Sequence, residues 1–328
     1  MQQQQTHPYQ NAAGWSLLVL AVPLLLWLSL PARRMVIAPA NLVFSHTAVE
    51  LFTVVVAVLV FVTGYRAILS VRKGAVVLLG VTFLGVGVLG FLHTLSSVGR
   101  PDAIAVNTIF SLAERALAAT ALLVYVVLPA VPEITKLKKR LAVALMLAVV
   151  GVFGLVVLAW PDQVAALWVR GESLTSPKLG LEWLIVCVNL ATLWVLWQRR
   201  EELVRECVMA LAFAATLSAV SELFFTTLGM DDLDGANVPG HLYRAVAYLY
   251  LFHATFNEAL RRPLERIEAQ HRREKLVLNA APDGVLWVND GGYILMVNPA
   301  METLTGYAMT ELVGQNVDIF LPPNLRVA

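Results

Sequence analysis

The chain has 328 residues, of which 58% are hydrophobic and only 14% are charged. Soluble domains carry about 25% charged residues, so the composition excludes an ordinary soluble protein and indicates a membrane protein. The 24 basic and 23 acidic side chains leave a net charge of +1, which gives no indication of nucleic acid or of an acidic substrate as a partner. The chain has two cysteines, Cys187 and Cys207, too few for a disulfide framework or a cysteine-based zinc site.

The apolar stretches predict the number of membrane helices, because a helix needs about 20 apolar residues to cross a bilayer. A polar tail over residues 1–13 precedes them and lacks the basic start of a secretory signal peptide, so we expect the first stretch to be retained. The candidate spans are residues 14–30, 43–65, 75–95, 104–129, 141–160, 180–198, 205–228 and 240–260. The sequence therefore predicts an all-α polytopic membrane bundle of about eight transmembrane helices over residues 14–260.

Basic residues predict the orientation, because cytoplasmic loops carry an excess of lysine and arginine. One set of alternate loops carries Arg66, Arg72, Lys73, Lys136, Lys138, Lys139, Arg140, Arg199, Arg200 and Arg205. The opposite set carries Arg33, Arg34, Arg100, Arg170 and Lys178. We therefore expect the first set, and both termini, to be cytoplasmic. Arg33 and Arg34 do not follow this rule, because they are basic residues in a loop that is expected outside.

Ionisable residues inside the apolar stretches are candidates for a functional site, because each costs at least about 2.5–3.5 kcal/mol to insert. The candidates for sensing a ligand or stimulus are His46, Glu50, His93, Glu114, Arg115, Glu222, His241, Arg244 and His253. In the expected topology most of them lie near the outer ends of their spans, where they could form one outward-facing pocket. Those outer residues are His46, Glu50, His93, Glu222, His241 and Arg244.

Three interpretations of these residues remain open. They could be hydrogen-bonded pairs that hold the helices together, a site that senses a proton or small ligand, or a site for a transition metal or haem. For a metal, the candidate ligands are His46, Glu50, His93 and His253. Glu114 and Arg115 are neighbours on one helix and cannot face each other, so each needs partners elsewhere. Weaker candidates of the same type are Asn107, Glu182 and Asn189.

The composition changes abruptly at Arg261, where a charged segment begins. Residues 261–278 predict a helical linker with apolar residues at Leu260, Leu264, Ile267 and Leu278. Their spacing suits a two-stranded coiled coil, although a solvated single helix fits as well.

After the linker, the pattern changes to mixed α and β structure. GVLWVND and YILMVN read as two strands joined by a turn at Asp290, Gly291 and Gly292. Asn298 followed by Pro299 predicts the start of a helix, and a second helix is expected to begin near Thr310.

This part of the chain resembles a PAS domain. The resemblance rests on Asp283-Gly284, the glycine turn, Asn298-Pro299-Ala300, Leu304-Thr305-Gly306-Tyr307 and Glu311-Leu312-Val313-Gly314, within residues 279–323. It implies that residues 279–328 form the N-terminal half of an α+β PAS domain, with the remaining strands expected beyond Ala328. The ligand of this PAS segment is unknown. The reactive cysteine of flavin-photoadduct PAS domains is absent, because the matching run is Gly314-Gln315-Asn316-Val317. The resemblance also implies a relay that forms homodimers.

The membrane part resembles the third class of bacterial membrane-associated sensor domains (MASE type) over residues 15–262. The similarity rests on FSHTAVELFTVVVAVLVFVTGY, on FLGVGVLGFLHTLSS and on a PAS segment that follows directly. Members of this family are input modules placed ahead of PAS domains and of histidine kinase or cyclic di-GMP cyclase and phosphodiesterase domains. The resemblance thus implies two-component or cyclic di-GMP signalling from the bacterial inner membrane.

We find no catalytic motif in these residues, so any enzyme activity is expected from a further domain. The sequence predicts a sensory input module in the lipid bilayer that relays a stimulus through the linker to the PAS segment. The alternative is a transporter or a haem or metal redox protein with an appended PAS domain. A transporter would show helices broken by Gly or Pro at mid-membrane, whereas the glycines here are explained more simply as helix contacts.

Overall fold

A computed structural model describes residues 39–67, 73–97, 104–128, 134–163, 169–170, 173–174, 176–203, 205–228 and 237–322. The predicted first span, residues 14–30, lies outside the described residues. The chain divides into two compact units, Met1–Arg262 and Pro263–Ala328.

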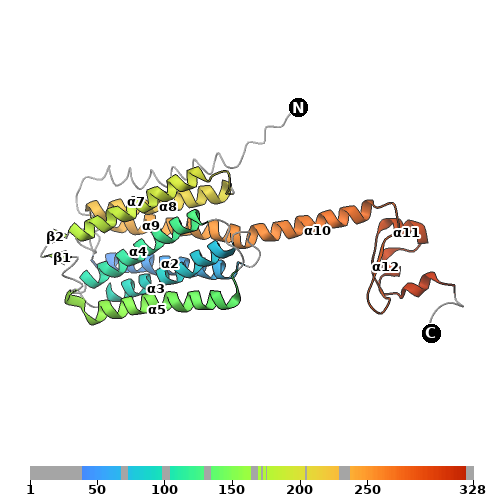
Figure 1. The fold of residues 1–328 in the computed structure, drawn as a ribbon, viewed down its shortest axis with the longest axis horizontal. Helices are drawn as coiled ribbons and strands as arrows, with labels where there is room; N and C mark the ends of the chain where they lie inside the picture. The colour runs from blue at the N-terminus through green and yellow to red at the C-terminus, as the bar shows by residue number, and fades with distance from the viewer. Residues whose placement is uncertain are drawn as a thin grey trace, which may run out of the picture. The chain divides into compact units, whose positions relative to one another are not determined.

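The first unit is a bundle of long α-helices that lie side by side (Figure 1). In its described part these are α2 (Pro39–Tyr65), α3 (Lys73–Ser97), α4 (Ile104–Val127), α5 (Lys136–Ala159), α7 (Ser176–Gln198), α8 (Arg205–Leu228) and α9 (Asn237–Phe256). Helix α2 packs on α3 and α9, α8 packs on α7 and α9, and α4 packs on α3 and α7. Helix α5 lies at the edge of the bundle, mainly against α3. A short antiparallel hairpin of β1 (Val169–Arg170) and β2 (Ser173–Leu174), which the sequence did not predict, lies between α5 and α7.

Six of the described helices, α2, α3, α4, α5, α7 and α8, are long and apolar enough to cross a membrane. The multi-pass membrane fold is therefore confirmed, although the expected number of about eight spans is only approximate. Helix α9 is not among the six, because its first turns carry polar residues such as His241 and Arg244. Both side chains are buried, so α9 presents them to the bundle rather than to the surrounding surface.

Glycine allows α2 and α3 to approach closely. A Cβ atom on Gly64 would lie 2.7 Å from the Val76 carbonyl oxygen and 2.9 Å from the Cα atom of Gly80. Small residues at such positions let membrane helices pack backbone against backbone. The α2 and α3 helices that carry His46, Glu50 and His93 are thus held tightly together.

Helix α9 is followed directly by a π-helical segment, η2 (Asn257–Arg261), and then by α10 (Arg262–Ala280). The helical linker predicted over residues 261–278 is therefore present and ends two residues later. Almost the whole of α10 is exposed, including the side chains of Leu264 and Ile267.

The second unit contains the predicted hairpin. Strands β3 (Leu286–Val288) and β4 (Ile294–Val297) pair antiparallel, with Leu286 opposite Val297, and Gly292 takes a φ of 78° in the turn. Short helices follow, namely α11 (Pro299–Thr305), α12 (Met309–Leu312) and the 3₁₀ turn η3 (Val317–Phe320). Asn298 is confirmed as the first N-cap, since its side chain accepts a hydrogen bond from the Met301 amide at 3.0 Å.

Candidate functional site

The ionisable residues of the membrane unit come from the same end of several helices. His46 and Glu50 lie in the first turns of α2, His93 is in the last turns of α3, and His241 and Arg244 are in the first turns of α9. Because the chain reverses direction between successive helices, these turns meet at one end of the bundle. The side chains there are all at least nine-tenths buried.

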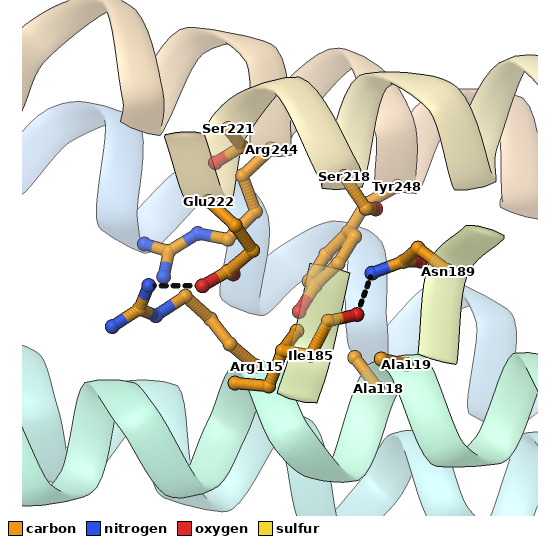
Figure 2. A pocket seen from close by; sticks show the side chains of 10 residues that line it. All are labelled: Arg115, Ala118, Ala119, Ile185, Asn189, Ser218, Ser221, Glu222, Arg244 and Tyr248. Carbon is orange, nitrogen blue, oxygen red and sulfur yellow. Dashed lines mark hydrogen bonds and ion pairs between the residues drawn. The ribbon is translucent and has the colours of Figure 1, made fainter. Parts of the chain in front are cut away.

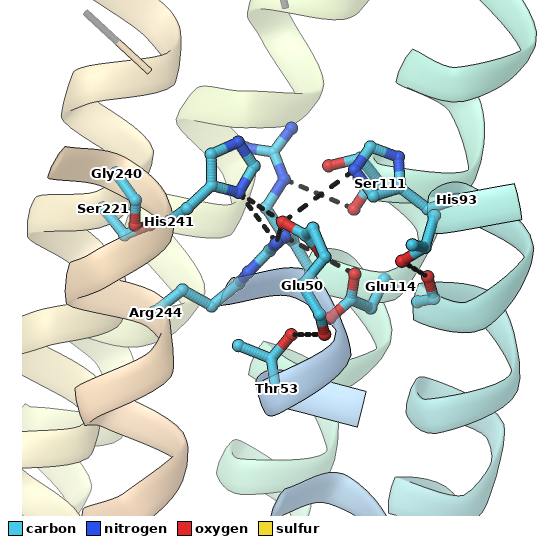
Figure 3. Close-up of polar contacts among 12 residues, drawn as sticks. Glu50, Thr53, His93, Ser111, Glu114, Ser221, Gly240, His241 and Arg244 are labelled. Atoms are coloured by element: carbon cyan, nitrogen blue, oxygen red, sulfur yellow. Dashed lines mark hydrogen bonds and ion pairs between the residues drawn. The ribbon is translucent and has the colours of Figure 1, made fainter. Parts of the chain in front are cut away.

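Glu50 is the centre of this group (Figure 3). Its carboxylate is fully buried, and its Oε1 atom contacts both the Arg244 guanidinium and the Nδ1 atom of His241. The Nε2 atom of His93 lies 3.9 Å from the same oxygen. The other oxygen, Oε2, has no hydrogen-bond partner within the described part of the chain. One carboxylate thus joins side chains from α2, α3 and α9.

Arg244 connects Glu50 to a second buried carboxylate, Glu114 of α4. Its Nη1 atom lies 3.4 Å from Glu114 Oε2, and the Tyr248 hydroxyl donates a hydrogen bond to Glu114 Oε1 at 3.1 Å. Arg244 and Tyr248 are one turn apart on α9. Glu114 thus connects α4 to α9 through the side chains of Arg244 and Tyr248.

Arg115 is the centre of a second group, and Figure 2 shows its contact with Glu222. Its Nη1 atom donates to Glu222 Oε2 at 2.6 Å, and its Nη2 atom lies 3.5 Å from Glu182 Oε1. Lys178 lies 3.8 Å from the same Glu182 oxygen. The prediction that Glu114 and Arg115 have separate partners is confirmed.

A cavity of about 20 Å³ lies between the two groups, with room for about one water molecule. Arg115, Glu222, Arg244 and Tyr248 line it (Figure 2). The guanidinium groups of Arg115 and Arg244 also lie over the Phe225 ring, at 4.5 and 5.9 Å from its centre. The two groups thus form one continuous region, which we call the polar cluster.

Three histidines lie beside Glu50. The ring of His46 is 4.5 Å from that of His241 and 5.9 Å from that of His93, measured between ring centres. Each of His46, Glu50 and His93 offers one ligand atom, and these three atoms lie within 4.8 Å of one another. The Nδ1 atom of His93 lies 3.0 Å from the carbonyl oxygen of Asn107. A carbonyl oxygen only accepts, so His93 carries its proton on Nδ1.

The structure brings together all of the candidate residues except one. His253 is exposed, and its Nε2 atom lies 2.9 Å from the side-chain amide of Asn257 rather than near His46, Glu50 or His93. The separation follows from the helix, because the 12 residues between His241 and His253 extend about 18 Å along α9 at 1.5 Å per residue. A ligand set that includes His253 is therefore not formed.

Sequence reasoning missed Tyr248 and misplaced Lys178. The spacing of four residues between Arg244 and Tyr248 could have indicated that both lie on one face of α9. Lys178 was expected in a loop, but α7 begins at Ser176, four residues earlier than expected, so Lys178 is a buried helical residue.

The polar cluster contains one more acidic group than permanently charged bases among the described residues. The acids are Glu50, Glu114, Glu182 and Glu222, and the bases are Arg115, Lys178 and Arg244. With all four carboxyl groups ionised and the histidines neutral, the cluster carries one net negative charge, which favours a cation as a ligand.

Comparisons with known proteins give family matches for both units. No curated protein and no solved structure matches the chain. A PAS domain family matches residues 270–327, in agreement with the hairpin and the capped helix of the second unit. The family MASE3, described as a membrane-associated sensor domain, matches residues 37–263. This match includes the helices that build the polar cluster and more than half of the 328 residues, so the chain belongs to the MASE3 family of membrane-associated sensor domains.

Proposed function

We propose that the polar cluster receives the stimulus and that α9 transmits the response to the PAS domain. A membrane-associated sensor domain followed by a PAS domain is a sensory module of signalling proteins. We add to this general role the region that receives the stimulus, the polar cluster, and the helix that carries the signal from it, α9. The observation that carries it is the position of His241, Arg244 and Tyr248 on the same helix that is followed directly by the linker.

The π-helical segment η2 supports this route. A π-turn holds one residue more than an α-turn and is frequent at functional sites. If the segment changes between α and π geometry, the helix after it rotates by about 100°, the rotation per residue of an α-helix. A change in the pairing of Arg244 could thus reach α10 as a rotation. Such a two-state element is what a sensor requires.

The described helices give less support to the alternative function, a transporter. The described spans α2, α3, α4, α5, α7 and α8 are continuous α-helices. Gly85, Gly87 and Gly90, which could have marked interruptions, lie against Met146, Ala57 and Glu114 of neighbouring helices. They are contact residues, as their small size suggests.

The oligomeric state and the output are further parts of the proposal. Leu264 and Ile267 of α10 are exposed and three residues apart, a spacing that suits a two-stranded coiled coil in a homodimer. The PAS domain would then act on a histidine kinase or a diguanylate cyclase or phosphodiesterase domain.

Most of the basic residues lie at the end of the bundle opposite to the polar cluster. We therefore place the cluster on the outer side of the bacterial inner membrane, with cytoplasmic termini.

The experiment measures how efficiently the two α10 helices of a dimer are crosslinked by a disulfide. Cysteines replace Leu264 or Ile267 in a chain from which Cys187 and Cys207 have been removed, and disulfide formation is followed in native membranes. We expect Glu50→Gln and Arg244→Gln to change the crosslinking efficiency by a factor of at least about 3. The matched control is Leu249→Ala, because Leu249 lies on α9 with an exposed side chain outside the cluster. Identical crosslinking in all variants, with each protein folded, would disprove the relay.

A further inference from the structure

We infer that His46, Glu50 and His93 bind a divalent transition-metal ion, with His241 available as a further ligand. This inference names the class of ligand for the polar cluster, and its role as the stimulus rests on the proposed function. The binding itself does not depend on that function.

The three donor atoms lie close enough together to bind one ion. His46 and Glu50 are four residues apart on α2 and share one face, a spacing that suits two ligands on a helix. Since the three donor atoms lie within 4.8 Å of one another, a central point is at most about 2.8 Å from each, compared with about 2.0–2.2 Å in a zinc site. Small rotations of the side chains close this difference.

The second argument is the tautomer of His93. Its Nδ1–H donates to the Asn107 carbonyl, which leaves Nε2 as the nitrogen available to a ligand, 3.9 Å from the Glu50 carboxylate. A metal ion bound between them would replace any proton on Nε2. Histidines that bind metals usually donate their other N–H to a carbonyl or carboxylate, which fixes the tautomer in this way. The hydrogen bond to Asn107 thus prepares Nε2 as a ligand.

The third argument is the type of donor. Imidazole nitrogen combined with one carboxylate suits zinc, nickel, copper or iron, whereas calcium and magnesium require oxygen ligands. The excess carboxylate of the cluster also favours a cation. His46 is the least buried of the three ligands, at 9% exposure, and gives the ion a side from which to approach.

Metal binding has a consequence for α9. Glu50 Oε1 is paired with Arg244 and His241 in the structure, so a metal ion that binds this oxygen competes with the Arg244 guanidinium. Arg244 retains Glu114, at 3.4 Å, as a partner. An ion held by Glu50 Oε1, His46 and His93 alone would therefore replace the Glu50–Arg244 contact between α2 and α9 by a contact between α2 and α3. This exchange is a direct way for a metal to act on the helix that precedes the linker.

The experiment uses Co²⁺ as a spectroscopic probe. Metal-free, full-length chain in detergent micelles is titrated with Co²⁺, and ligand-field absorption in the visible range is recorded. We expect one Co²⁺ per chain, which Zn²⁺ displaces. Each of His46→Ala, Glu50→Gln and His93→Ala should weaken Co²⁺ binding at least about 100-fold, because even the partners of metal ligands contribute 10–100-fold.

Two control variants separate a ligand from a structural residue. His253→Ala removes a histidine of α9 outside the cluster, and Glu202→Gln removes a carboxylate that lies outside the cluster and pairs with Arg199. Both should bind Co²⁺ as the unchanged chain does. His93→Cys should keep the ion and add a sulfur-to-cobalt charge-transfer band, which only direct coordination produces. This variant and His46→Ala decide the question if Glu50→Gln fails to fold.

The inference is overturned if the folded chain shows no Co²⁺ spectrum, if His93→Ala binds Co²⁺ as well as the unchanged chain, or if the purified protein shows a porphyrin spectrum. The metal site and the relay can fail separately. If Co²⁺ binds but leaves α10 crosslinking unchanged, the metal site stands and its role as the input is wrong. If cluster variants change the crosslinking but Co²⁺ does not bind, the relay stands and the metal site is wrong.

Discussion

At the scale of single residues, the polar cluster combines buried charges that each have more than one partner. Arg244 contacts Glu50 and Glu114, and Arg115 contacts Glu182 and Glu222. Removing one partner from a buried ion pair is costly because the other charge stays buried without compensation. Shared partners reduce this cost. The cluster can therefore exchange pairs without unfolding.

Glu222→Gln should lower the free energy of unfolding in detergent by about 3 kcal/mol. This value is the lower end of the range for breaking a buried ion pair, because Arg115 still has Glu182 as a partner. Thermal or denaturant unfolding followed by circular dichroism measures the change. The control is Glu202→Gln, because Glu202 is 63% exposed in its pair with Arg199, and such pairs contribute less than about 1 kcal/mol. Equal losses in both variants would show that burial of the Arg115 pair is unimportant.

Asn298→Ala should destabilise the PAS unit by about 1–2 kcal/mol. The Asn298 side chain accepts hydrogen bonds from the Val285 and Met301 amides and donates to the carbonyls of Leu278 and Asp283. Amide hydrogen exchange over residues 279–322 measures the loss. Asn298→Ser keeps an oxygen that can cap the Met301 amide and should lose less. A Ser variant as unstable as the Ala variant would contradict the capping role.

At the scale of elements, close helix packing positions the ligands of the cluster. Gly64 and Gly80 allow contact between the backbones of α2 and α3, and Gly90 of α3 leaves space for the Glu114 side chain, 3.3 Å from where a Cβ would lie. A side chain at any of these positions would separate helices that carry cluster residues. The glycines thus contribute to the site without touching a ligand.

Gly64→Ala should destabilise the bundle by about 1–3 kcal/mol, because its Cβ would overlap the Val76 carbonyl, which belongs to the backbone and cannot rotate away. Thermal unfolding in detergent is the measurement. Gly151→Ala on α5 is the control, since a Cβ there meets nothing within 4 Å. Alanine favours a helix over glycine by up to about 1 kcal/mol, so this variant should be neutral or more stable. The opposite order of stabilities would refute the packing argument.

At the scale of the whole molecule, the position of the basic residues and of the cluster defines a direction across the membrane. Lys136 to Arg140 begin α5 at one end of the bundle, whereas His93 and His241 lie at the other end. In the proposed orientation the buried cluster lies nearer the outer surface of the membrane, and the linker begins on the cytoplasmic side.

Alkaline phosphatase fused after residue 101 should be active, and the same enzyme fused after residue 133 should be inactive. Its disulfides form only in the oxidising periplasm, so activity reports the side of the membrane. A cytoplasmic reporter enzyme at the same positions should give the reverse pattern. Activity only after residue 133 would mean that the cluster faces the cytoplasm.

The amino-acid sequence alone determined the membrane class, the position of most helices and the PAS hairpin, because these depend on local patterns. A long apolar run forms a helix in a bilayer, and Asn298 followed by Pro299 favours the start of a helix. The ends of helices were less predictable. Helix α5 begins at Lys136 rather than at residue 141, because Thr135 caps it ahead of the apolar run.

Only the tertiary structure decided which ionisable residues act together. Sequence spacing places His46 and Glu50 on one face of α2, but it does not say that His93 faces them or that Arg244 joins Glu50 to Glu114. His241 and His253 both lie on α9, yet one is buried in the cluster and the other is exposed. The reason is physical: the rotation of each helix about its axis is set by packing against its neighbours, and that packing depends on contacts between residues far apart in the chain.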